Sequence, residues 1–118
     1  MSTLPPAHQD NNIVKATLGA AHILGCPPEL LGRLFGCDPG RVARHIETDT
    51  AAKETARLFL NCYRSLHDLL NGAEDNMRYW FSAENYHFGC APKERMQQTE
   101  GLTAVSEYLA TLVKKPKA

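Results

Sequence analysis

Apolar residues recur three and four positions apart along most of the chain, the spacing that places side chains on one face of a helix. The clearest stripe lies between Ala51 and Leu70 and predicts one long amphipathic helix. Its apolar positions are Ala56, Phe59, Cys62, Tyr63, Leu66, Leu69 and Leu70. No alternating apolar–polar run of useful length occurs, and β-branched residues are scattered. The pattern therefore predicts an all-α fold.

The segment before the long helix begins with a polar stretch that contains paired prolines. We expect residues 1–12 to form a flexible arm. A first helix is expected from about Asp10, whose carboxylate can cap it, to a stop at Gly25.

Two short helices follow, separated by a sharp turn. The first covers residues 29–35 and ends at Gly36. Asp38, with Pro39 directly behind it, is expected to cap and start the second. Gly40 lowers the helix propensity of that second segment.

The chain after the long helix predicts a compact group of small elements. Asn71-Gly72 is typical of a left-handed helix end. Short helices are expected over residues 74–80 and 92–96, with a loop over 82–89 between them. A last helix begins near Gly101, and its inward residues are Leu102, Val105, Leu109 and Leu112.

The two short helices and their turn form a helix-turn-helix pattern within residues 13–50. Val42 and Ile46 are expected to pack inward, which leaves the arginines of the second helix exposed. Such a helix can enter the major groove, where arginines bind guanine edges or phosphates. The candidate DNA-binding residues are Arg33, Arg41, Arg44 and His45. A plain helical hairpin with solvated arginines fits the same spacing, and both interpretations stay open.

The charge balance restricts how DNA could be bound. The 118 residues include 13 Lys and Arg and 13 Asp and Glu, so the formal net charge is zero. The two signs are also evenly spread, apart from a short basic tail at residues 114–118. The neutral charge therefore argues against binding of nucleic acid through bulk electrostatic attraction. Any DNA site must be a local cluster, and we expect operator affinity to depend on pairing of protomers, because helix-turn-helix proteins bind paired half-sites.

The sequence carries no pattern typical of an enzyme or a metal site. The four cysteines lack C-x-x-C spacing and are expected to be reduced and structural, so we expect no metal and no cofactor. The five histidines are scattered, no nucleophile is paired with one, and no phosphate-binding glycine motif occurs. No apolar run approaches the length of a membrane span, and the N-terminus lacks a secretory signal pattern. We therefore expect a cytoplasmic protein without catalytic residues.

The order of elements near the C-terminus resembles the toxin-binding domain of the Xre/MbcA/ParS antitoxin family. The pattern is a Trp, then N-x-x-φ-G-x-x-P, a short helix, E-G and a final apolar helix, with φ an apolar residue. Its positions here are Trp80, Asn85, Phe88, Gly89, Pro92, Met96, Glu100, Gly101, Val105 and Leu109. The upstream helix-turn-helix pattern and the long helix are similar to the rest of that family, so the resemblance covers about residues 13–113. Phe88 departs from it, because the family usually has an aliphatic residue there.

The resemblance implies an antitoxin of a bacterial type II toxin–antitoxin operon. Its expected partners are a RES-type toxin that degrades NAD or ADP-ribosylates an enzyme, operator DNA, and further copies in a homodimer or larger complex. The C-terminal domain would cover the toxin's active-site cleft, and the helix-turn-helix would repress the operon. The implied division is an arm (1–12), a helix-turn-helix domain (13–50), a linking helix (51–72), a toxin-binding domain (73–113) and a basic tail (114–118). The implied toxin-binding residues are Trp80, Phe88, Gly89, Pro92, Leu112, Lys114, Lys115 and Lys117.

Two other functions fit the same residues. One is a stand-alone helix-turn-helix transcriptional regulator without a toxin partner. The other is a small helical adaptor that binds no DNA.

Overall fold

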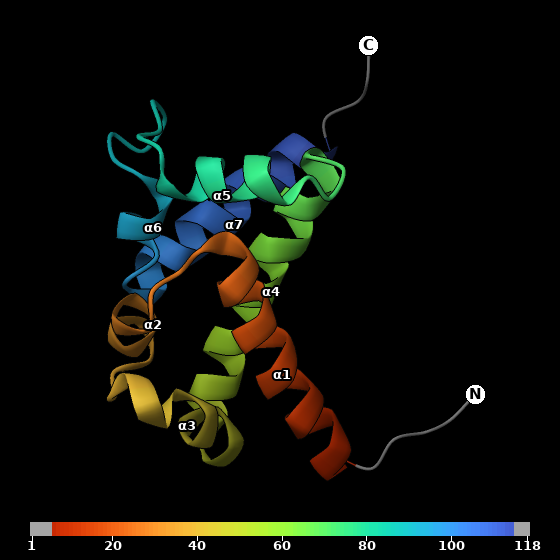
Figure 1. The fold of residues 1–118 in the computed structure, drawn as a ribbon, viewed down its shortest axis with the longest axis vertical. Coiled ribbons are helices and arrows are strands. Elements are labelled where there is room, and N and C mark those ends of the chain that lie inside the picture. The colour runs from red at the N-terminus through yellow and green to blue at the C-terminus, as the bar shows by residue number, and fades with distance from the viewer. Residues whose placement is uncertain (1–5, 115–118) are drawn as a thin grey trace, which may run out of the picture.

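The computed structural model describes residues 6–114, and the side chains of residues 12–113 within them. This part of the chain is built from helices and contains no strand beyond one isolated bridge, between Asn85 and Cys90, so the predicted all-α class is confirmed (Figure 1). The elements are α1 (Pro6–Leu24), α2 (Pro28–Phe35), the 3-10 helix η1 (Pro39–Arg41), α3 (Val42–Thr48), α4 (Thr50–Leu69), α5 (Glu74–Ser82), α6 (Pro92–Arg95) and α7 (Thr99–Lys114).

The long helix α4 is the axis of the molecule. Figure 1 shows α3 beside one end of α4, α5 and the end of α7 near its other end, and α2 and α6 together at the left. The apolar stripe predicted from the sequence is its buried face, with Ala56 and Phe59 fully enclosed. Asp49 starts α4 because its carboxylate accepts a hydrogen bond from the Ala52 N–H at 3.0 Å. The apolar spacing of α4 therefore matches the sequence prediction, and a backbone N–H in its first turn has a hydrogen-bond partner.

The first helix is longer than the sequence pattern indicated. It begins at Pro6, so residues 6–12 are helical and do not form the arm that we expected. Asp10 lies inside this helix and cannot act as its N-cap. Proline has no backbone N–H and a fixed φ, which suits a first helical turn. The predicted stop at Gly25 is confirmed by its φ of +72°. Residues 1–5 lie outside the described part.

The turn between α2 and α3 is built on glycine. Gly36 adopts a left-handed conformation with a φ of +70° and ends α2 as predicted. The predicted Asp38 cap is wrong, because the Asp38 side chain makes no capping hydrogen bond and a short 3-10 helix follows it. Proline and glycine occupy the first two positions of this segment, which favours a 3-10 turn over a regular α-helix. The regular helix α3 therefore begins only at Val42.

One hydrophobic core runs through the whole described chain. It includes Leu24 from α1, Phe59 from α4, Phe81 from α5 and Leu102 from α7. Polar contacts join the same elements: the Cys62 thiol donates to the Leu102 carbonyl at 3.7 Å, linking α4 to α7. None of the helices in residues 6–114 is both long enough and apolar enough to cross a bilayer.

Candidate functional site

The loop between α5 and α6, residues 83–91, is folded tightly by its own hydrogen bonds. The Asn85 side-chain oxygen accepts from the His87 N–H at 2.8 Å, which is an Asx turn. The Asn85 carbonyl accepts from the Gly89 N–H at 2.8 Å, and the Asn85 N–H donates to the Cys90 carbonyl at 3.0 Å. Gly89 has a φ of +74°, a conformation that glycine adopts at little cost. The N-x-x-φ-G pattern thus specifies one closed turn.

Three rings fix this turn on the last helix. The His87 ring stacks on the Tyr108 ring, with centroids 4.1 Å apart and planes at 17°. Phe88 meets Tyr108 edge-on at 5.3 Å, and the Arg95 guanidinium lies 6.0 Å from the Phe88 centroid. Such aromatic and cation–π contacts stabilise a partly exposed cluster. The turn is therefore attached to both α6 and α7.

One aromatic residue of the turn remains outside this cluster. The Tyr86 side chain is fully exposed, at 104% of the reference accessibility. On α5, Tyr79 is also exposed, at 74%. The described chain thus presents two tyrosines to solvent on either side of Ser82, where α5 ends.

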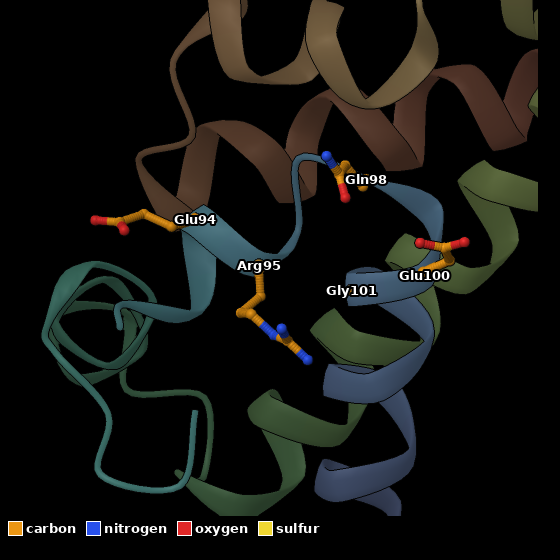
Figure 2. A pocket seen from close by; sticks show the side chains of 5 residues that line it. All are labelled: Glu94, Arg95, Gln98, Glu100 and Gly101. Carbon is orange, nitrogen blue, oxygen red and sulfur yellow. The ribbon is translucent and has the colours of Figure 1, made fainter. Parts of the chain in front are cut away.

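The start of α7 lies unusually close to the end of α6. A Cβ atom at Gly101 would overlap the Arg95 carbonyl oxygen and would lie 2.7 Å from the carbonyl carbon. An open depression of about 350 Å³ lies at this junction, lined by Glu94, Arg95, Gln98, Glu100 and Gly101 (Figure 2). Figure 2 shows the Glu94 and Arg95 side chains leaving α6 in different directions. Gly101 is therefore required by packing and not by its φ angle.

The other residues that we predicted to bind a toxin differ in how far they are buried. Pro92 is fully buried at the first turn of α6, whereas Trp80 is only half-buried against the core. Phe81 and Met77, from the same helix α5, are fully buried in the core. Leu112 also packs against the core. Lys114 ends α7, its side chain is outside the described set, and Lys115 and Lys117 lie outside the described residues.

The candidate DNA-binding residues do not all lie in the same environment. Arg41 and Arg44 are exposed and His45 is half-exposed, while Val42 and Ile46 are buried as expected. The Arg33 guanidinium donates to the side-chain oxygen of Gln97 at 3.3 Å, so it contacts the segment between α6 and α7.

The cysteines of the described chain are unpaired, and two of them are strongly affected by burial. All four cysteines are free, and burial raises the pKa of Cys62 and of Cys26 to about 12. Both thiols therefore stay protonated near neutral pH and pack as small apolar groups. No group of three or more His, Cys, Asp or Glu side chains among the described residues is arranged to hold a metal ion.

Sequence reasoning missed the ring cluster and the exposed tyrosine. The aromatic run from Tyr86 to Phe88 was visible, but Tyr108 is 20 or more residues away. Only the fold brings Tyr108 and Arg95 to the turn, and nothing in helical spacing marks which ring of the run faces outward.

The comparison with known families concerns the same C-terminal region. Residues 65–112 match the family model described as the antitoxin Xre/MbcA/ParS C-terminal toxin-binding domain. The match spans the last turn of α4, all of α5 and α6, the turn of residues 83–91 and nearly all of α7. No curated protein matches the chain. The matched segment is less than half of the 118-residue chain, and it shows that residues 65–112 are similar to this toxin-binding domain.

Proposed function

We propose that this protein is a non-enzymatic antitoxin that neutralises a RES-type toxin by covering the toxin's active-site cleft. The observation that carries the proposal is the toxin-binding-domain match over residues 65–112. Those residues include the hydrogen-bonded turn of residues 83–91, the exposed ring of Tyr86 and the depression lined by charged side chains between α6 and α7. Such features are suited to protein recognition. Trp80, Phe88, Gly89 and Pro92 would shape this domain, because each lies at a helix end or in the turn that joins α5 to α6.

Co-expression tests the neutralising function. The toxin encoded beside this gene should arrest growth alone and should become harmless when this protein is co-produced. Purified toxin should consume NAD, and a stoichiometric amount of this protein should stop that reaction. A toxin that stays lethal in the presence of this protein would contradict the antitoxin function. A neutralised toxin that leaves NAD untouched would contradict only the RES type.

The basic tail is a further part of this proposal. Leu112, Lys114, Lys115 and Lys117 lie at the end of α7 or beyond it, and a positive segment is electrostatically suited to a cleft built for an anionic dinucleotide. Deletion of residues 114–118 should then weaken NAD-hydrolysis inhibition. Full protection by the truncated protein would remove the tail from the mechanism.

We also propose that the protein represses its own operon through α3. On α3, Arg44 and His45 lie between the buried residues Val42 and Ile46. Arg41 directly precedes α3, and Arg33 would contribute from α2. The region carries few positive charges for a DNA-binding surface, so paired protomers or a toxin-bridged complex would be needed for useful operator affinity.

The double variant Arg41→Ala with Arg44→Ala tests the DNA surface. Promoter affinity should fall and its salt dependence should flatten, since fewer counterions are released, while toxin binding stays unchanged. Arg57→Ala with Arg64→Ala is the matched control, because it removes two exposed arginines from α4. Equal promoter affinity for the two double variants would place the DNA surface elsewhere.

A further inference from the structure

We infer that Tyr86 is an anchor residue of the antitoxin–toxin contact, inserted into a recess on the toxin that accepts a phenol ring. The inference rests on the proposed neutralising function and names a residue for it. It does not involve the basic tail. Its first support is exposure, because the entire Tyr86 side chain is accessible at the tip of a turn. An aromatic ring held fully in water gains apolar burial only from a partner.

The second support is the rigidity of the backbone that carries Tyr86. Its two neighbours are both fixed: Asn85 by backbone bonds to Gly89 and Cys90, and His87 by stacking on Tyr108. The Asx turn from Asn85 to the His87 N–H spans Tyr86 itself. A side chain presented on a preorganised backbone loses little conformational entropy on binding. The fold thus fixes the backbone from which this ring projects into solvent.

The third support is the place of Tyr86 within the family match. Residues 65–112 are matched as a toxin-binding domain, and the only exposed large hydrophobic side chains described within them are Tyr79 and Tyr86. Tyr79 lies on a polar face of α5, with Asp75 and Ser82 at helical spacing and exposed. Tyr86 instead stands beside the His87–Phe88–Tyr108 cluster. Aromatic residues are enriched at the centres of protein–protein interfaces, and an exposed ring next to an aromatic cluster fits that composition.

The charges around the turn favour a protein partner over nucleic acid. Glu84 and Glu94 are exposed near the turn, as is Arg95, and Lys93 is half-buried. Their charges cancel, so the surface offers no attraction to a polyanion. The occupant that we assign is therefore the toxin protein.

Affinity measurements with purified toxin and full-length variants test the inference. Tyr86→Ala should weaken binding about 30-fold or more, the loss typical of an aromatic anchor. Tyr86→Phe, which keeps the ring, should stay within about threefold of the wild type. Tyr79→Ala removes the same side chain from α5 and should also change affinity less than about threefold. All three should unfold at the wild-type temperature, because neither tyrosine is packed in the core.

Each other outcome has a distinct meaning. Wild-type affinity in Tyr86→Ala would overturn the anchor role while leaving neutralisation intact. A loss of self-association without loss of toxin affinity, seen by sedimentation, would assign the ring to a second copy of this chain and overturn the inference. Failure of the wild-type protein itself to bind toxin would overturn the proposed function and the inference together.

Discussion

Gly101 and Gly89 are both glycines of the matched motif, but they are needed for different reasons. At Gly101 a Cβ atom would overlap backbone atoms of Arg95, whereas at Gly89 it would meet nothing within 4 Å. Gly89 is instead held at a φ of +74°, where an L side chain is strained. Gly101→Ala should therefore cost about 3 kcal/mol of unfolding free energy, since α6 and α7 must move apart. Gly89→Ala should cost only about 1–2 kcal/mol.

Chemical denaturation of both glycine variants measures these costs. Gly89→Asn is a useful third variant, because asparagine tolerates the left-handed conformation better than alanine and should recover part of the loss. A Gly101→Ala variant as stable as Gly89→Ala would mean that the α6–α7 junction relaxes freely.

Thr17 is a residue of α1 whose polar side chain lies in the hydrophobic core. It is completely buried, and its hydroxyl oxygen has no hydrogen-bond partner among the residues that the structure describes. Thr17→Val keeps the shape and removes the unsatisfied hydroxyl, so the unfolding free energy should rise by about 1 kcal/mol. Thr103→Val is the control, because the Thr103 hydroxyl already bonds to the Thr99 carbonyl at 3.0 Å and should gain nothing. A Thr17→Val variant less stable than the wild type would show that the hydroxyl is hydrated.

At the scale of the element, two aspartates precede helical segments and only one caps. Asp49 accepts from the Ala52 N–H, whereas Asp38 makes no capping bond. Asp49→Ala should therefore lower stability by about 1 kcal/mol, and Asp38→Ala should change it by less than about 0.5 kcal/mol. Thermal unfolding of the two variants gives the comparison. Equal losses would mean that both carboxylates act through the helix dipole and not through a bond.

Features that depend only on neighbouring residues could be predicted from the sequence, whereas others could not. The period of α4, the left-handed stop at Gly36 and the Asn71-Gly72 end were predictable, because each depends on neighbouring residues alone. The 3-10 turn after Asp38 and the early start of α1 at Pro6 were not, since several caps and turns compete at similar energies. The contact of His87 with Tyr108 was beyond reach because it depends on how α7 packs.

At the scale of the whole molecule, the N-terminal and C-terminal elements behave as one body. The buried cluster includes side chains from α1, α4, α5 and α7 without interruption. Arg78 of α5 donates to the Ile23 carbonyl at 3.0 Å, which satisfies an acceptor in the last turn of α1. The hydrocarbon part of Arg78 also lies beside Gly25, 3.4 Å from the position that a Cβ atom there would take. A toxin bound to the C-terminal elements would therefore contact a unit whose hydrophobic core also includes residues of α3.

Unfolding experiments test this continuity. Trp80 is the one tryptophan, so its fluorescence reports the C-terminal part, whereas far-ultraviolet circular dichroism reports all helices. The two signals should give the same denaturation midpoint, because a shared core unfolds cooperatively. Separate midpoints would show that the parts unfold independently.

Arg78→Ala tests the link itself, with Arg57→Ala as its control. Each arginine pairs with an acid three residues earlier, Arg78 with Asp75 and Arg57 with Glu54, and both pairs are exposed enough to contribute little. Only Arg78 also bonds to α1, so its loss should cost about 1–2 kcal/mol against less than about 0.5 kcal/mol for Arg57. Because the apolar core remains, Arg78→Ala should still unfold in one transition. Equal losses of unfolding free energy in the two variants would mean that the hydrogen bond from Arg78 to the Ile23 carbonyl does not stabilise the protein.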